Sequence, residues 1–122
     1  MFDHIGLDVK DFGKSKAFYE KALKPLGYTL TASYETAAGF GVKDKKAFWL
    51  VGGRGQTKTA HVAFSAPNRK AVDEFYKTAT AAGGKDNGKP GVRKDYHPNY
   101  YAAFVLDPDG NNIEAVCQIP AG

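Results

Sequence analysis

Apolar and polar residues alternate at the start of the chain. Between Asp3 and Val9 every second residue is isoleucine, leucine or valine, which is the period-two pattern of a strand with one buried face. Asp11 is placed to cap a helix over 13–23, where apolar residues recur at helical spacing. We predict three short strands after this helix, at 28–34, 39–42 and 47–51.

The second half of the chain repeats this pattern. Residues 61–65 alternate as residues 4–8 do, Asn68 is the candidate cap of a second helix, and two glycines end that helix. Six pairs of similar residues share one offset of 57 positions, with no gap needed: His4 and His61, Asp11 and Asn68, Phe18 and Phe75, Tyr19 and Tyr76, Ala22 and Ala79, and Gly27 and Gly84. A constant offset of this kind indicates an internal repeat.

The end of the chain predicts a β-hairpin. Residues 107–110 read Asp-Pro-Asp-Gly, in which proline fixes φ and glycine accepts a positive φ. Residues 101–106 before this turn and 113–117 after it have the composition of strands. The stretch 85–100 is rich in glycine, lysine, aspartate and proline, so we expect most of it to be a surface loop, which could reach over a site.

These patterns predict an α+β fold. We expect one domain over residues 1–122, with two tandem βαβββ modules at about 1–52 and 59–119 and a polar connector at 52–58. Each module should pack its helix against one face of its own sheet, because a sheet with one apolar face must bury that face.

Three residues that can bind metals fall on the same side of their predicted strands. If the apolar residues of 3–9 pack under the first helix, His4 faces the opposite side of the sheet. The same parity applies to His61 and to Glu114, a carboxylate among apolar strand residues. A buried charge is costly unless it is paired or bound to a metal. A lone strand histidine is more often structural, but two at equivalent repeat positions, with a glutamate of matching parity, favour a divalent-metal site.

Composition and charge argue against several other classes of protein. The formal net charge is +4 and the isoelectric point is near 9.1. The lysines are scattered along the chain, which is not typical of a nucleic-acid-binding surface, although a mildly basic face could help to recruit a small anionic substrate. No apolar run approaches the length of a membrane span, and the start lacks a secretory pattern. A single cysteine, Cys117, cannot form an internal disulfide, so we expect a cytoplasmic protein.

These stretches together resemble the vicinal oxygen chelate superfamily, which includes glyoxalase I, bleomycin-resistance proteins, thiol-transferring fosfomycin-resistance enzymes and extradiol dioxygenases. The resemblance rests on segments that span nearly the whole chain: His4–Val9, Ser15–Tyr19, His61–Phe64 and Asp107–Glu114. It implies a glyoxalase-like fold, with a curved mixed sheet around a metal-binding cleft, and commonly a homodimer. It also implies a divalent ion, such as Zn, Ni, Mn or Fe, on His4, His61 and Glu114, which chelates neighbouring oxygens of a substrate.

The chain departs from the main branches of that family. Glyoxalase I enzymes usually place a fourth ligand, a glutamate, where this chain has Trp49. Tryptophan cannot bind the metal, so Trp49 either lines the cleft or is a core aromatic. Fosfomycin-resistance and extradiol enzymes tend to carry a tyrosine where this chain has Phe104. Fosfomycin-resistance enzymes also favour a threonine where this chain has Gly6.

Residues upstream of Glu114 are further candidates for the site. His97 and Tyr101 could supply an acid–base group beside Glu114, because a histidine near its ordinary pKa of about 6.5 suits proton transfer at neutral pH. The candidates for contact with a substrate are Trp49, Tyr100 and Phe104. The alternative interpretation of His97, Tyr100 and Tyr101 is a loop anchored by aromatic packing.

The sequence is consistent with three functions. The leading hypothesis is a metal-dependent enzyme with lyase, isomerase or dioxygenase chemistry on a small oxygenated substrate. The alternative is a binding or sequestering protein of the bleomycin-resistance kind, in which an aromatic cleft around Trp49 and Tyr101 holds the ligand without turnover. The third is a structural or nucleic-acid-binding protein. The sequence leaves open the substrate, the metal, and whether the modules pair within one chain or across a dimer.

Overall fold

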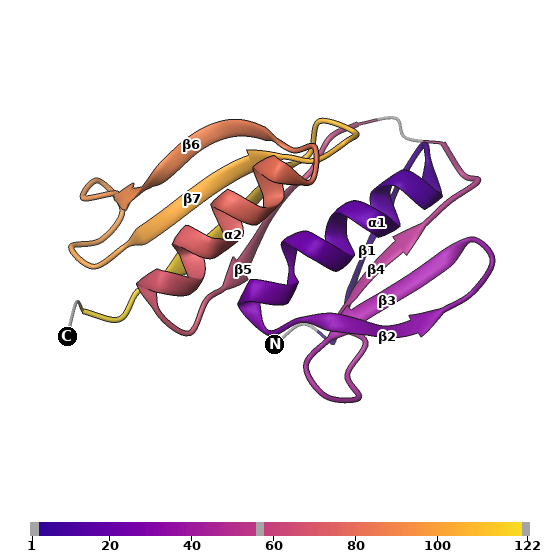
Figure 1. The fold of residues 1–122 in the computed structure, drawn as a ribbon, viewed down its shortest axis with the longest axis horizontal. Coiled ribbons are helices and arrows are strands. Elements are labelled where there is room, and N and C mark those ends of the chain that lie inside the picture. Colours follow the sequence, from indigo (N-terminus) through magenta and orange to yellow (C-terminus); the bar gives the residue numbers. More distant parts are fainter. Residues whose placement is uncertain (1–2, 56–57, 121–122) are drawn as a thin grey trace.

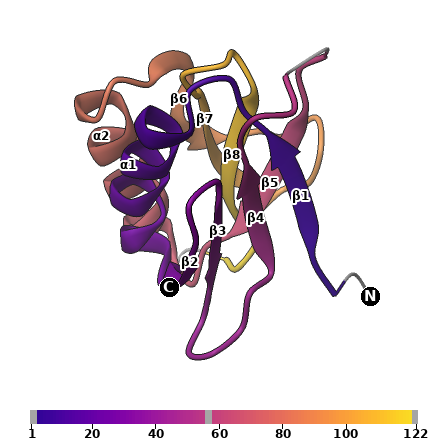
Figure 2. The same ribbon diagram turned by 90° about the vertical axis from the view of Figure 1, so that its right-hand side faces the viewer.

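The structure is a computed structural model that describes residues 3–55 and 58–120, and it contains two βαβββ modules (Figure 1). The first module comprises β1 (Ile5–Asp8), α1 (Phe12–Ala22), the short 3-10 helix η1 (Lys24–Leu26), β2 (Thr29–Ser33), β3 (Ala37–Gly41) and β4 (Phe48–Val51). The second comprises β5 (His61–Ser65), α2 (Arg69–Ala81), β6 (Lys85–Val92), β7 (Tyr101–Leu106) and β8 (Asn112–Cys117). Both helices lie on the same side of the strands (Figure 2). The predicted α+β fold is confirmed.

Each module forms a four-stranded mixed sheet with the same strand order. The orders are β1-β4-β3-β2 and β5-β8-β7-β6, and in each sheet the first strand pairs in parallel with the last. The register also repeats, because Gly6 lies opposite Trp49 in the first module and Ala63 lies opposite Glu114 in the second. Gly6 and Ala63 are themselves separated by the repeat offset. Trp49 and Glu114 therefore occupy equivalent positions, as predicted.

Both helices are capped by the residues that the sequence predicts, although α1 begins at Phe12, one residue before the expected start. The Asp11 side chain accepts a hydrogen bond from the Lys14 N–H at 3.0 Å, and the Asn68 side chain accepts one from the Ala71 N–H at 2.8 Å. Each side chain pairs an N–H group that the first helical turn leaves without a partner. These caps fix the residue at which each helix begins.

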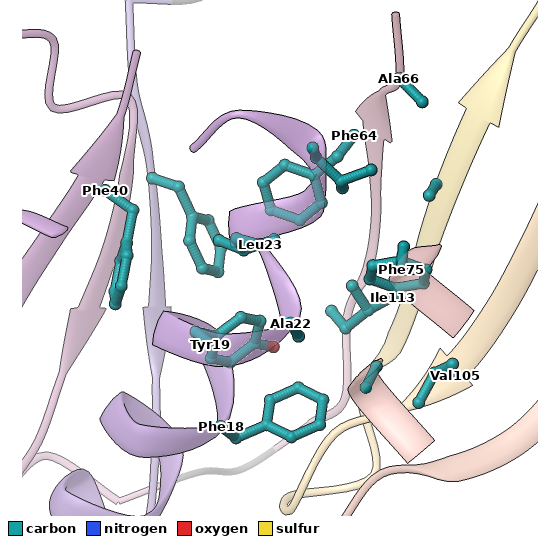
Figure 3. Close-up of a cluster of buried hydrophobic side chains, with 14 of the residues drawn as sticks. Phe18, Tyr19, Ala22, Leu23, Phe40, Phe64, Ala66, Phe75, Val105 and Ile113 are labelled. Carbon is teal, nitrogen blue, oxygen red and sulfur yellow. The ribbon is translucent and has the colours of Figure 1, made fainter. Parts of the chain in front are cut away.

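One hydrophobic core is shared by the two modules (Figure 3). Phe48 of β4 and Phe64 of β5 form an edge-to-face pair with ring centroids 5.1 Å apart, and Tyr28 packs on Phe64 at 5.3 Å. Such aromatic pairs contribute more than their buried area alone. The modules are therefore held together by packing as well as by the chain. No helix in the described ranges is long and apolar enough to cross a membrane.

The stretch 85–100 differs from the prediction. Its first half is strand β6, not a loop, and only residues 93–100 form the irregular connection to β7. β6 pairs with β7 through register shifts on either side of Gly88, so the turn-forming residues produce bulges within a strand, where glycine is commonly found. The predicted connector 52–58 includes residues 56 and 57, which lie outside the described residues.

A buried polar network links the first helix to the final hairpin. The Tyr19 hydroxyl donates to Asp107 Oδ2 at 2.6 Å, and the Asn111 side-chain amide donates to the same oxygen at 2.9 Å. Asp107 Oδ1 accepts from the N–H groups of Asp109 and Asn111 at 2.9 and 2.8 Å. Burial, followed by the charge of Asp107, raises the pKa of Tyr19 well above its usual value. Tyr19 thus remains a proton donor and fixes the turn that precedes β8.

Substitution of Tyr19 by phenylalanine should therefore destabilise the protein. Tyr19→Phe leaves one bond of a buried carboxylate unmade, and we expect a loss of about 1–3 kcal/mol in the free energy of unfolding, measured by urea denaturation. Tyr34→Phe is the control, because Tyr34 is 65% exposed and such surface changes usually stay within about 0.5 kcal/mol. Equal stability of the two variants would contradict a supporting role for the network.

Candidate functional site

Two of the three predicted metal ligands are in contact within one chain. His61 on β5 and Glu114 on β8 come from neighbouring strands, and His61 Nε2 lies 2.7 Å from Glu114 Oε1. The side chain of Glu114 is only 2% exposed, whereas that of His61 is 55% exposed. The pair thus places a buried carboxylate behind an imidazole that is open to solvent.

Tyr100 completes the surroundings of the Glu114 carboxylate. Its hydroxyl donates a short hydrogen bond to Glu114 Oε2, the oxygen that His61 does not contact. Burial, together with this bond and the charge of Glu114, raises the pKa of Tyr100 to about 12. Tyr100 is therefore protonated at neutral pH. The irregular connection 93–100 does reach the site, through its last residue.

Phe104 and Arg93 lie beside this pair. Phe104 on β7 is directly opposite Glu114 on β8, and its ring centroid is 6.3 Å from that of His61. The Arg93 guanidinium carbon lies 5.4 Å from the centroid of the Phe104 ring. Arg93 was missed by the sequence analysis, because nothing distinguishes it from other basic residues in a stretch that resembled a surface loop.

His4 is not part of this group. Its Nδ1 atom lies 2.7 Å from Asp3 Oδ1, and its side chain is 58% exposed. It lines a separate pocket of about 180 Å³ with Tyr28, Phe48 and Phe64. Within residues 3–55 and 58–120, no three histidine, cysteine, aspartate or glutamate side chains gather closely enough to hold a metal ion. A single chain therefore brings together His61 and Glu114 but does not add His4.

Trp49 belongs to an aromatic stack in the first module. Its indole N–H donates to the carbonyl of Lys46 at 3.0 Å, and its ring stacks on Tyr34 with centroids 6.4 Å apart and planes 15° apart. A Cβ atom at Gly39 would lie 3.2 Å from the indole. The ring can therefore pack against the backbone of Gly39 because this residue has no side chain. Trp49 is half-buried and Tyr34 is exposed, so part of this stack is open to solvent.

Tyr101 and His97 are not brought to the His61–Glu114 pair. The Tyr101 hydroxyl donates to Asp73 on α2 at 2.5 Å, and this bond is the main cause that raises its pKa. Tyr101 lies three residues from Phe104 on β7, so the two side chains point to opposite faces, and it is Phe104 that lies opposite Glu114. His97 Nδ1 accepts from the N–H of Asn99 at 3.0 Å within the connection 93–100.

Comparison with known proteins points to one family. The model of the Glyoxalase/Bleomycin resistance protein/Dioxygenase superfamily matches residues 1–115. A glyoxalase/bleomycin resistance protein from Albidiferax ferrireducens T118 has 28% sequence identity and a TM-score of 0.84, covering 96% of this chain and 98% of its own. A putative glyoxalase from Bacillus halodurans has 26% identity and a TM-score of 0.72, covering 96% and 95%.

A larger enzyme shows the same likeness over part of its length. The V278E mutant of glyoxalase I from Zea mays has 27% identity and a TM-score of 0.73, and the match covers 94% of this chain but 45% of the maize chain. No curated protein matches the chain in sequence.

Ionisation of Tyr100 should occur at unusually high pH. The difference in ultraviolet absorbance between wild type and Tyr100→Phe should show a phenol that titrates near pH 12, not near the usual 10. Because the folded-state pKa is raised, the stability that this group contributes is complete below about pH 10 and is lost as the pH rises toward the folded value. The same difference measured in denaturant is the control, and there the phenol should titrate normally. Identical folded and unfolded titrations would contradict the bond to Glu114.

Proposed function

Because the chain belongs to the glyoxalase/bleomycin resistance protein/dioxygenase superfamily, we propose that it is a divalent-metal-dependent enzyme acting on a small molecule with neighbouring oxygen atoms. The observation that carries this proposal is the 2.7 Å approach of His61 Nε2 to Glu114 Oε1. Family membership supports the class of protein, and the pair supplies the position at which such a protein would hold its metal.

The donor atoms of the pair suit a divalent transition metal. An imidazole nitrogen and a carboxylate oxygen are ligands that Zn, Ni, Mn and Fe accept. Tyr100 occupies Glu114 Oε2, which leaves Oε1 directed toward His61. Partners of this kind orient metal ligands and adjust their basicity. We assign His61 and Glu114 as ligands and Tyr100 as the residue that positions Glu114.

The third ligand would be His4 of a second copy of the chain. His4, just before β1, is more than half exposed, and the His61 side chain is open to solvent as well. Both helices lie on one side of the strands (Figure 2), so the other side is free to face another chain. In a homodimer, the first module of one copy would pair with the second module of the other, giving two equivalent sites by symmetry.

The surrounding side chains suggest how a substrate would be handled. When bound, the metal would act as a Lewis acid on a substrate oxygen. The Phe104 ring lies beside that of His61, with centroids 6.3 Å apart, and would reduce access of water from that side. Trp49 and its stacking partner Tyr34 offer an aromatic wall in the first module. His97, which hydrogen-bonds within its own loop, would serve as an acid or base only after movement of that loop.

A binding protein without turnover is the second candidate. It is favoured by the Glu114 carboxylate, because each of its two oxygens has a protein partner, His61 or Tyr100. It is also favoured by the partly open stack of Trp49 and Tyr34. In that case ligand binding would depend on the aromatic wall, and it would persist after chelation in a Glu114→Ala variant.

Metal binding should depend on the pair and, to a smaller degree, on Tyr100. We expect wild type to bind a divalent ion, and His61→Ala or Glu114→Gln to lose it because each removes a donor atom. Tyr100→Phe removes only a positioning group, so affinity should fall about 10- to 100-fold. A competition titration against a chromogenic chelator measures these affinities. Glu74→Gln on the exposed face of α2 is the matched control and should bind normally. Metal-replete wild type without bound ion would contradict the proposal.

Mixing two defective variants tests whether the site is shared between chains. A dimer of one His4→Ala chain and one His61→Ala chain would contain one complete site. Random mixing should therefore restore about a quarter of the wild-type metal content, since half of the dimers are mixed and each has one of two sites intact. His61→Ala mixed with Glu114→Gln is the control, because both changes fall in the same half of the site and no complete site can form. Restoration in neither mixture would indicate that His4 is not supplied across a dimer.

A further inference from the structure

Arg93, the first residue after β6, is fixed in place by the backbone of that strand. The side chain folds back along β6, where one guanidinium nitrogen donates to the carbonyl of Gly91 at 2.8 Å and the other to that of Lys89 at 2.7 Å. A Cβ atom at Gly88 or Gly91 would lie 3.2 or 3.1 Å from these nitrogens. The guanidinium therefore lies in a space that exists because two residues of the bulged strand lack side chains.

The positive charge of Arg93 has no carboxylate partner in the described part of the chain. None of the ion pairs among residues 3–55 and 58–120 includes it. Asp86, on β6, accepts from the Gly88 N–H at 3.0 Å. Arg93 is half-buried, and its two bonds leave other guanidinium N–H groups unused. A partly desolvated cation with free donors is suited to receive an anion.

This cation lies next to the pair proposed to hold the metal. Arg93 packs over Phe104, whose ring also pairs with His61 and whose strand position is opposite Glu114. The backbone N–H of Arg93 donates to the carbonyl of Tyr100 at 2.7 Å, so the two ends of the connection 93–100 are hydrogen-bonded to each other. Arg93 is at one end, and Tyr100, whose hydroxyl is bonded to Glu114, is at the other.

We propose that Arg93 binds an anionic group, a carboxylate or a phosphate, on the substrate of this site. The inference rests on the proposed function for the location of the reacting oxygens, and it names the substrate class as a small organic anion. The planar fork of a guanidinium matches the oxygens of either group. A purely structural Arg93 would need only its two carbonyl bonds and its ring contact, and it would not affect the affinity for anions.

Titrations with paired probes test this assignment. Inorganic phosphate, propionate and the neutral analogue propionamide are added to the full-length protein, and NMR follows the Arg93 Nε–H and the Phe104 amide. Each titration is run once with chelator and once with metal, because a bound metal can itself attract anions. The variants are Arg93→Gln, Arg93→Lys and the control Arg54→Gln, since Arg54 lies near Asp8 at 3.7 Å and is on a different segment.

We expect phosphate and propionate, but not propionamide, to shift the Arg93 signals of wild type and of Arg54→Gln. Affinity for anions should fall at least about 10-fold in Arg93→Gln and less in Arg93→Lys, which keeps the charge but loses the fork. A stronger response to phosphate than to propionate, or the reverse, identifies the group. Absence of binding to wild type, or equal binding by Arg93→Gln, overturns the inference.

The outcome is separable from that of the proposed function. His61→Ala removes a proposed metal ligand and leaves Arg93 intact, so its anion binding in chelator should match wild type. If wild type binds no metal but binds anions through Arg93, the metal-dependent proposal fails and the anion site stands. If metal binds normally and anions ignore Arg93, only the anion site fails.

Discussion

The site depends on the compensation of one buried charge. Glu114 is almost completely buried in the middle of a β-strand, where an unpaired carboxylate would be costly. His61 and Tyr100 each take one of its oxygens. These two partners come from β5 and from the connection before β7, so the charge can be accommodated only when the second sheet and the connection are both formed. Formation of the site and folding of this module are therefore coupled.

The two modules share one architecture and differ in chemistry. At the equivalent strand positions, the first module has Trp49 opposite Gly6, and the second has Glu114 opposite Ala63. The tryptophan is placed against the bare backbone of Gly39, whereas the glutamate is opposite Phe104. The repeat thus supplies one strand position twice, with an aromatic side chain in the first module and a buried carboxylate in the second. In the proposed homodimer, pairing of unlike modules would bring these two positions to one ligand.

Glycine in β6 has a direct consequence for the site. Bulges interrupt the pairing of β6 with β7, and the absence of side chains at Gly88 and Gly91 leaves space that the Arg93 guanidinium fills. A regular strand with ordinary residues would exclude this arrangement. The irregular strand thereby adds a fixed positive charge beside Phe104, at no cost to the pairing of β7 with β8.

The sequence alone determined the repeat, the helix caps, the Asp-Pro-Asp-Gly turn and the matching strand parity of His61 and Glu114, because these depend on local periodicity and on single-residue conformational preferences. The alternation of side chains along a strand could also have shown that Tyr101 faces away from Glu114, because Tyr101 is three residues from Phe104, which lies opposite Glu114. Only the tertiary structure decided that Tyr100 reaches Glu114 and that Arg93 lies beside the site. It also decided that residues 85–92 form a bulged strand and that His4 lies apart from His61 within one chain. These outcomes depend on strand register and on the packing of one module against the other, which involve residues far apart in the chain and leave no periodic signal in it.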